Sequence, residues 1–315
     1  MACRTILFRT RAVGGERPMS SFLARIADGD VLITDGATGT YLQQNGLEPG
    51  GCPEEFNSDH PEVIRGMAEA YFAAGSDMVE TNSFGGSRYM LAKYGHGERV
   101  EELNRLAAEL ARSAAPEGCF VLGSIGPTGE ILAEKGGTAD SEEMYGVFKE
   151  QARGLAAGGV DAVCIETMSD LTGEMSLAIR AVKEATGLPV VATLCFDRGP
   201  RGLFTMMGDT PQSASEALTE MGADVVGSNC GIAIGDMIDV IGAMRQATDR
   251  PILTHINAGI PRIEAGEIVY PDSPEYMADQ MERVVAAGAN LVGGCCGTGP
   301  EYVRAFVSRL RGTAP

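Results

Sequence analysis

Residues 291–303 read LVGGCCGTGPEYV: an apolar run, two glycines, two adjacent cysteines, and then a Gly-Pro-Glu that favours the start of a helix. A continuous apolar run is typical of a strand buried on both faces of a parallel sheet. The same pattern, a short β-rich run with small or polar residues at its end and an amphipathic helical stretch behind it, recurs along the whole chain. The runs are residues 31–36, 77–85, 120–129, 162–170, 189–197, 224–231, 251–259 and 290–297.

Helical stretches separate these runs, for example residues 61–75, 141–159, 213–223 and 273–289. Several end in Ala-Gly or Gly-Ala just before the next strand, as a glycine C-cap and a short turn require. Eight strand–helix units in 315 residues predict the α/β class and a single-domain (β/α)8 TIM barrel. A doubly wound open sheet is the alternative, but the first strand precedes Gly-x-x-Gly rather than a Gly-x-Gly-x-x-Gly nucleotide fingerprint. We expect the barrel at residues 25–312 and a flexible N-terminal extension at residues 1–24.

Composition excludes several classes of partner. The net charge of −18 repels phosphate backbones and anionic lipid, so we expect neither nucleic acid nor membrane as a partner. Eight cysteines are too dilute for a disulfide scaffold, which favours a reducing, cytoplasmic location. Cys164 and Cys195 lie in apolar runs and are interpreted as core residues, whereas Cys52 is interpreted as a loop thiol.

In a TIM barrel the functional side chains stand at the C-terminal ends of the strands. In this sequence those ends carry Asp35, Glu80, Asn82, Ser124, Glu166, Cys195, Cys230, Asn257, Cys295 and Cys296. The sixth and eighth strand ends thus contribute Cys230, Cys295 and Cys296 to one rim. Three thiolates suit Zn²⁺, and three protein ligands leave the fourth position open, as catalytic zinc sites do. The sequence therefore predicts a catalytic zinc site at these three cysteines.

The charge of such a site indicates its chemistry. Zn²⁺ with three thiolates is net negative, so it is a poor Lewis acid for polarising a carbonyl or generating hydroxide. It suits an incoming thiol, whose pKa it lowers while the sulfur stays electron-rich enough to attack an alkyl carbon. Of the three histidines only His255 lies near a strand end, and we expect it in the core or in a supporting role. Methyl transfer between sulfur and a good leaving group needs alignment rather than an acid–base catalyst.

Polar groups at two other strand ends predict an amino-acid site. Glu166 ends the apolar run AVCIE, and a buried carboxylate needs a partner such as an ammonium group. The GATGT turn after Asp35 could present backbone N–H groups to a carboxylate, at a helix start where anions are favoured. These features predict binding of a zwitterionic α-amino acid with a thiol at its far end. Asp170, by contrast, is interpreted as a helix N-cap.

Seven motifs in the chain resemble, in order, those of the homocysteine S-methyltransferase family. They are DGATGT (35–40), ETNSFGGSR (80–88), GSIGPTG (123–129), ETMSD (166–170), GSNCG (227–231), NAGIP (257–261) and GGCCGTGPEYV (293–303). The resemblance covers about residues 25–310. Within the family, the chain most resembles the homocysteine-binding module of cobalamin-dependent methionine synthase.

The resemblance implies a zinc-binding barrel that activates homocysteine as a zinc-bound thiolate and methylates it to methionine. It implies Cys230, Cys295 and Cys296 as the metal ligands and catalytic residues. The residues implied to hold the amino acid are Asp35, Thr81 and Glu166, with the backbone of Gly36 and Ala37. Asn257 is hypothesised to fill the fourth metal position when no thiol is bound.

The methyl donor stays open at the level of sequence. The implied donors are methylcobalamin carried on a corrinoid-binding partner protein and a sulfonium such as S-methylmethionine. Betaine is disfavoured because a quaternary ammonium needs aromatic groups, and the chain has no tryptophan. In addition, Gly85 follows Phe84 where the betaine-using branch has a tyrosine, which leaves Tyr41, Tyr89 and Phe204 as candidate aromatics.

Two alternative functions fit the same residues. One is a methyltransferase or demethylase of this family that acts on another thiol or methylated substrate with a corrinoid protein as partner. The other is a non-catalytic barrel subunit in which zinc is structural. A structural site usually closes with four protein ligands, so the number of ligands separates this last alternative from the others.

Overall fold

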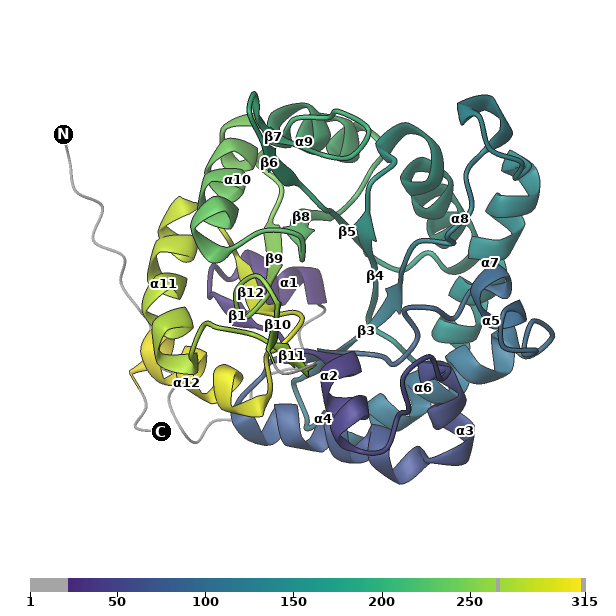
Figure 1. The fold of residues 1–315 in the computed structure, drawn as a ribbon, viewed down its shortest axis with the longest axis horizontal. Coiled ribbons are helices and arrows are strands. Elements are labelled where there is room, and N and C mark those ends of the chain that lie inside the picture. Colours follow the sequence, from purple (N-terminus) through teal and green to yellow (C-terminus); the bar gives the residue numbers. More distant parts are fainter. Residues whose placement is uncertain (1–21, 265–266, 313–315) are drawn as a thin grey trace.

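The computed structural model of the chain describes residues 22–264 and 267–312. At its centre is a ring of eight parallel strands, and helices surround that ring (Figure 1). The strands are β1 (Leu32–Ile33), β2 (Met78–Glu80), β3 (Phe120–Ile125), β4 (Ala162–Met168), β5 (Val190–Leu194), β8 (Val225–Asn229), β9 (Ile252–Ile256) and β12 (Leu291–Gly294). Each strand lies inside one of the eight runs predicted from the sequence, so the predicted (β/α)8 barrel is confirmed.

The strands close into a barrel through one short seam. Hydrogen-bonded ladders join them in the order β1-β12-β9-β8-β5-β4-β3-β2. Between β1 and β2, the N–H of Asp77 donates to the carbonyl of Ile33 at 2.7 Å, and the Asp77 carboxylate accepts the N–H of Ile33 at 2.8 Å. Near the other end of the seam, the N–H of Glu80 donates to the Asp35 carboxylate at 2.7 Å. The C-terminal ends of all eight strands therefore meet at one rim.

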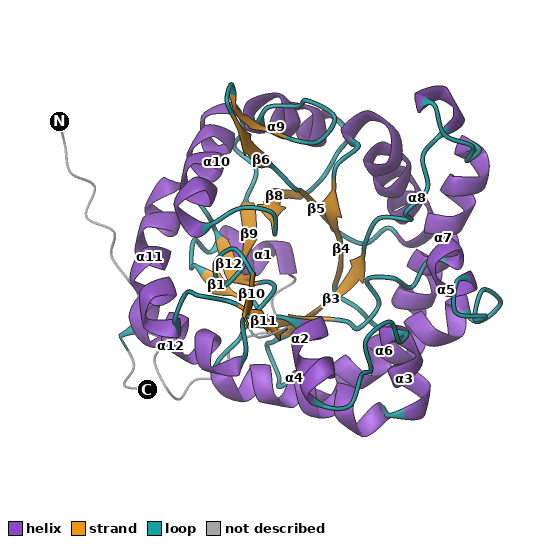
Figure 2. Ribbon diagram, in the orientation of Figure 1, coloured by secondary structure: helices purple, strands orange, loops and turns teal. Residues whose placement is uncertain are grey.

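The outer layer consists of one principal helix after each strand (Figure 2). These helices are α4 (Pro61–Ala74), α6 (Val100–Ala114), α7 (Ser141–Ala157), α8 (Ser176–Thr186), α9 (Pro211–Glu220), α10 (Ile234–Ala247), α11 (Pro274–Ala287) and α12 (Pro300–Arg311). Shorter helical segments are α1 (Phe22–Ala27), α2 (Thr38–Gln44), η1 (Pro53–Glu55), α3 (Phe56–Asp59), α5 (Arg88–Ala92), η2 (Ala133–Lys135) and the π-helical η3 (Leu171–Met175). No helix in the described part of the chain is both long and apolar enough to cross a bilayer.

The N-terminal end of the barrel is plugged by apolar side chains. Inward-facing residues from all eight strands, among them Leu32, Met78 and Leu291, form one buried cluster with Phe22 and Ile26 of α1. The Phe22 ring meets that of Phe120 edge-on, with 5.6 Å between centroids. In Figure 1, α1 is seen through the ring of strands. Of the predicted extension, residues 1–21 lie outside the described residues, and residues 22–24 belong to α1.

Two hairpins, which the sequence reading did not predict, interrupt the strand–helix alternation. β6 (Asp197–Gly199) and β7 (Gly202–Phe204) follow β5, and β10 (Arg262–Glu264) and β11 (Glu267–Val269) follow β9. β10 and its preceding turn are exposed, and so is Ile268 of β11. These hairpins lengthen two of the loops at the C-terminal rim, on either side of β8.

Candidate functional site

The three predicted cysteines meet at the C-terminal rim. Cys230 directly follows β8, and Cys295 and Cys296 directly follow β12. Their sulfur atoms all lie within 4.8 Å of one another, and the Cys230 and Cys296 Sγ atoms are 3.9 Å apart. Four sulfurs placed tetrahedrally at about 2.3 Å from zinc stand roughly 3.8 Å apart, so this spacing fits a thiolate zinc site.

Backbone hydrogen bonds to β9 hold two of the three cysteines in place. The N–H of Cys230 donates to the His255 carbonyl at 3.0 Å, and the N–H of Cys295 donates to the Ile256 carbonyl at 2.9 Å. Cys230 adopts a left-handed φ of +60°, which is rare for a residue with a side chain. Hydrogen bonds from the Cys295 and Cys296 thiols lower the pKa of Cys230 far below its ordinary value. Hydrogen bonds to Cys230 in turn raise the pKa of Cys295 and Cys296, so in the metal-free protein these two thiols donate to one thiolate.

Asn257, which directly follows β9, supports the cluster. Its side chain is buried, and its Oδ1 accepts the N–H of Cys296 at 3.1 Å. A hydrogen bond from the Asn257 side chain also helps to lower the pKa of Cys230. The Asn257 oxygen, which was hypothesised to fill the fourth metal position, thus already accepts one hydrogen bond from the Cys296 backbone.

The cysteines open onto a cavity of about 360 Å³ inside the rim. The residues that line it come from six of the eight strand ends and from the loops that follow β1 and β2. The predicted site residues in its wall are Gly36, Ala37, Thr81, Glu166, Cys230, Cys295 and Cys296. Phe84, Met90 and Tyr94 form an apolar side of the cavity. Their place in the wall was not predicted, because they follow the end of β2 by several positions. Tyr41, Tyr89 and Phe204 are not among the lining residues.

Two predicted carboxylates are buried beside this cavity. Glu166 accepts a hydrogen bond from the Ser124 hydroxyl at 2.5 Å and another from the Asn229 amide at 3.2 Å. Burial raises the pKa of Asp35 to about 7, and burial likewise raises that of Glu166 to about 7. Neither carboxylate has a cationic side chain as a partner among the ion pairs of the described residues. A bound cation would therefore stabilise their ionised forms.

Glu80 and His255 lie close to Glu166, and the three side chains form a cluster of titratable groups. Ligand atoms of the three side chains lie within 4.8 Å of one another, with Glu80 Oε2 at 3.8 Å from His255 Nδ1. Burial raises the pKa of Glu80 well above its ordinary value, and burial lowers that of His255 to about 4. His255 is 2% exposed and neutral at physiological pH. This agrees with the core or supporting role expected for it.

The turn after β1 differs in one detail from the predicted anion site. The N–H of Ala37 donates to the Thr298 carbonyl at 2.9 Å and is not free for a ligand. Helix α2 begins at Thr38 without a side-chain cap, and Thr38, Gly39 and Thr40 line the cavity. Their N–H groups are the first-turn donors that a helix leaves unpaired. A Cβ on Gly36 would stand 2.5 Å from the Thr298 carbonyl oxygen, so this turn requires glycine.

Thr81 takes part in a small network of hydroxyl groups. Its Oγ1 accepts the N–H of Ser124 at 3.0 Å and lies 2.6 Å from the Ser83 hydroxyl. Since the Ser83 hydroxyl donates to the Ser124 carbonyl at 2.7 Å, Thr81 is the donor in the Thr81–Ser83 pair. This use of the Thr81 proton leaves only an acceptor lone pair for a substrate.

The other interpretations from sequence have the following outcomes. Cys164 is fully buried in the barrel interior, as expected. Cys195 is half-buried, and its thiol donates to the Asn229 carbonyl at 3.0 Å, so it borders the site rather than the core. Cys52 precedes η1 in a loop but is buried against Glu54. Asp170 caps η3, accepting the N–H groups of Gly173 and Glu174 as predicted.

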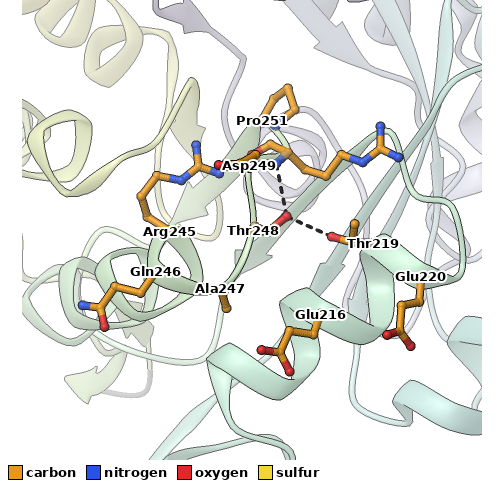
Figure 3. Close-up of a pocket in the computed structure, with 10 residues that line it drawn as sticks. Glu216, Thr219, Glu220, Arg245, Gln246, Ala247, Thr248, Asp249 and Pro251 are labelled. Carbon is orange, nitrogen blue, oxygen red and sulfur yellow. Dashed lines mark hydrogen bonds between the residues drawn. The ribbon is translucent and has the colours of Figure 1, made fainter.

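A larger recess of about 750 Å³ lies at the opposite end of the barrel, between α9 and the start of β9 (Figure 3). Some of its polar groups pair with each other. The Thr219 and Thr248 hydroxyls are 2.9 Å apart, and the N–H of Arg250 donates to Thr248 at 3.1 Å. It holds no cluster of metal-binding side chains among the residues described. In TIM barrels this end serves stability rather than catalysis.

Comparison with known proteins places the chain in a family. The sequence profile of the homocysteine S-methyltransferase family matches residues 32–310. The chain therefore belongs to the homocysteine S-methyltransferase family, and the resemblance noted in its motifs is confirmed.

Individual relatives agree with this assignment. Methionine synthase of Mycobacterium leprae is 33% identical over 309 residues, covering 90% of this chain and 25% of that protein. Methionine synthase of Mycobacterium tuberculosis is 32% identical over 294 residues, covering 87% of this chain and 24% of that protein. The chain thus spans about a quarter of the length of these relatives.

Solved structures show the same fold. The metallated form of the homocysteine methyltransferase MmuM from Escherichia coli superposes with a TM-score of 0.76 at 23% identity, covering 91% of this chain and 98% of that chain. Its oxidized form gives 0.74 at 24% identity, covering 91% and 99%. At this level of identity the likeness supports the barrel fold.

Proposed function

We propose that this chain is a zinc-dependent methyltransferase that moves a methyl group onto the sulfur of homocysteine and forms methionine. The observation that carries the proposal is the cluster of three cysteine sulfurs within 4.8 Å, opening onto the same cavity as Glu166. Family membership and the metallated form of MmuM support it. When bound, zinc would lower the pKa of the substrate thiol and leave its sulfur nucleophilic.

The number of ligands supports a catalytic site over a structural one. Within the described residues the cysteine group has three members, and no histidine or carboxylate joins it. Three ligands leave a position for a substrate thiol, whereas structural sites close with four. The non-catalytic alternative is therefore disfavoured. The Asn257 amide oxygen accepts one hydrogen bond, from Cys296, and its second lone pair could fill the fourth metal position when no thiol is bound.

The amino-acid end of homocysteine fits the acidic and N–H groups on the other side of the cavity. Glu166 and Asp35 would hold the α-ammonium. Its positive charge would stabilise the ionised carboxylates, which burial disfavours. The first-turn N–H groups of α2, at Thr38 and Gly39, would hold the α-carboxylate. Gly36 allows the backbone to pass close to Thr298. Thr81, whose Oγ1 accepts the Ser124 N–H, forms part of the cavity wall.

The transfer itself needs no proton from the protein. The substrate sulfur attacks the methyl carbon, the bond from that carbon to the donor breaks, and the leaving group keeps the electron pair. His255 is neutral and buried, in keeping with a reaction that uses alignment rather than acid–base catalysis. Phe84 and Tyr94, 43% and 41% exposed at the cavity edge, mark the side from which a donor would approach.

For the donor we propose methylcobalamin on a corrinoid-binding partner protein, with a sulfonium such as S-methylmethionine as the second candidate. The similarity to methionine synthases favours the first. Acting on another thiol, or removing a methyl group from a methylated substrate, would use the same cysteine cluster. The acceptor and the direction of transfer therefore need a direct assay.

The test is an assay of zinc-loaded protein with homocysteine and a panel of donors: methylcobalamin free and on a corrinoid protein, S-methylmethionine, and betaine. Methionine is measured by mass spectrometry. We expect methionine from a corrinoid or sulfonium donor and none from Cys296→Ala protein. Absence of methionine with every donor would defeat the proposal, and product from another thiol only would favour the alternative acceptor.

A further inference from the structure

Asn229 is a fully buried residue at the end of β8, immediately before Cys230. Its Oδ1 accepts hydrogen bonds from the N–H of Thr167 at 2.8 Å and from the Thr193 hydroxyl at 2.7 Å. Its Nδ2 donates to the Thr167 hydroxyl at 2.7 Å and to Glu166 Oε2 at 3.2 Å. A side-chain amide has two donor hydrogens and two acceptor lone pairs, so every one of them is used. The amide orientation is therefore fixed.

The partner of Asn229 on β4 is an irregular piece of strand. The pairing of β4 with β5 shifts register between Ile165 and Met168, and Thr167 adopts a φ of +61°. Thr167 and Cys230 are the non-glycine residues of positive φ in the described chain. Asn229 binds one of them through two hydrogen bonds and is covalently joined to the other. Such strained residues persist only where their surroundings hold them, and they gather at functional sites.

This placement links the two ends of the substrate site. β4 delivers the Glu166 carboxylate, and β8 delivers the Cys230 sulfur. The Asn229 amide ties the β4 bulge and the Glu166 carboxylate to the residue before Cys230. A shift of Asn229 would therefore change the distance between the groups that receive an ammonium and a thiol.

We propose that Asn229 is a positioning residue that orients Glu166 relative to the cysteine cluster, so that the site selects a thiol carrying an α-ammonium two methylenes away. The proposal rests on the proposed function, since it assigns the ammonium to Glu166. If this is so, the gain in affinity that the substrate ammonium provides depends on Asn229.

The test compares two ligands that differ only in the ammonium: homocysteine and 4-sulfanylbutanoate. Their affinities for zinc-loaded protein are measured by titration calorimetry in wild type, Asn229→Ala and Thr193→Val. Thr193→Val removes only the hydroxyl that orients the Asn229 amide, so it keeps the test decisive if Asn229→Ala fails to fold. Ser228→Ala is the matched control, because this buried hydroxyl on the same strand has no hydrogen-bond partner. Zinc content is measured for every protein.

A hydrogen-bonded charge pair predicts a preference of about 10- to 100-fold for homocysteine in wild type. We expect that preference to fall to within about threefold in Asn229→Ala, partly in Thr193→Val and not at all in Ser228→Ala, with one zinc retained in each. Equal loss of affinity for both ligands in Asn229→Ala and Thr193→Val, with the preference intact, would show a structural role only and overturn this inference alone. Wild-type protein that binds neither thiol would contradict the proposed function itself.

Discussion

Cys230 and Cys295 are 65 positions apart in the chain, but the backbone N–H groups of all three cysteines are held by β9 or by the residue that follows it. Cys230 and Cys295 donate to carbonyls of β9, and the Cys296 N–H is bound by the Asn257 side chain that follows it. The scaffold thus positions all three proposed ligands through their backbones. A preformed thiolate cluster of this kind lowers the cost of ordering the site around a metal.

The first prediction at this scale concerns one ligand. Cys296→Ala should lose stoichiometric zinc and all methyl transfer while it keeps the fold, because two sulfurs hold zinc far less tightly than three. Zinc is measured by atomic absorption and the fold by circular dichroism. Cys119→Ala, at the N-terminal end of β3, is the matched control and should keep both zinc and activity. Zinc retained at one per chain in Cys296→Ala would refute the assignment.

The second prediction concerns the amino-acid end. Glu166→Gln keeps the shape of the side chain and removes its charge, so the KM for homocysteine should rise about 10- to 100-fold. Zinc content should stay unchanged, because Glu166 is not part of the cysteine cluster. Steady-state kinetics of the variant checks this, and an unaltered KM would remove Glu166 from the substrate site.

The third prediction is a pH dependence of binding. Burial raises the pKa values of Asp35 and Glu166 to about 7 in the ligand-free protein, so both carboxyls become largely neutral below that pH. An ammonium ligand favours their ionised forms, and homocysteine binding must then release protons at low pH. Affinity should fall as the pH is lowered from 8 to 6, by up to about tenfold per unit for each proton released.

Titration calorimetry over this range measures that effect. Zinc content is determined at each pH, so that loss of metal is not mistaken for protonation of the carboxyls. The control ligand is 4-sulfanylbutanoate, which lacks the ammonium and should show a weaker dependence. An affinity for homocysteine that is flat between pH 6 and 8 contradicts the prediction.

At the scale of elements, the barrel separates a structural end from a functional end. Inward-facing residues at the strand starts pack with α1, whereas those at the strand ends are polar and line the cavity. Phe22 is 3% exposed and joins α1 to the base of β3. This base therefore contributes to stability, and Phe22 and Ile26 of α1 are not among the residues that line the cavity.

The fourth prediction follows from this separation. Phe22→Ala should lower the free energy of unfolding by about 3 kcal/mol through the lost burial and the cavity it leaves. Zinc binding and the KM for homocysteine should not change. Urea denaturation and zinc analysis measure these quantities. Tyr276→Ala, at an exposed position of α11, is the matched control and should change stability by less than about 0.5 kcal/mol. An equal effect of the two substitutions would contradict the role given to α1.

The regular elements were predictable because each obeys a local rule. Apolar runs such as AVCIE predicted the strands, and the cysteines at the ends of β8 and β12 predicted a cysteine cluster. The hairpins β6–β7 and β10–β11 were missed because each is short and lies inside a loop. The β4 bulge and the role of Asn229 were missed because they depend on contacts between strands, which spacing along the chain does not encode.

At the scale of the whole molecule, the fold has a large core that does not involve Cys230, Cys295 or Cys296. The main cluster spans the strands and the outer helices, and Phe148, Phe196 and Phe306 are fully buried within it. Among the described residues the cysteine cluster sits at the rim, half-buried, and contributes little apolar burial. Folding should therefore not require the metal.

The fifth prediction tests this independence. Removal of zinc with a chelator such as 1,10-phenanthroline should leave the circular dichroism spectrum unchanged and lower Tm only by the amount expected for loss of a bound ligand. Methyl transfer should disappear and should return when zinc is added back. Cooperative unfolding on chelation would instead favour the barrel with a structural zinc.

The most direct test of the account is zinc K-edge X-ray absorption of the protein with and without homocysteine. The account predicts one zinc per chain with three sulfur neighbours at about 2.3 Å, rising to four sulfurs when homocysteine is added. Asn257→Ala tests the fourth position of the substrate-free site: loss of an oxygen neighbour would assign it to Asn257, and an unchanged spectrum would discard that hypothesis. A sulfur count that does not rise when homocysteine is added would contradict a catalytic zinc that binds the substrate thiol.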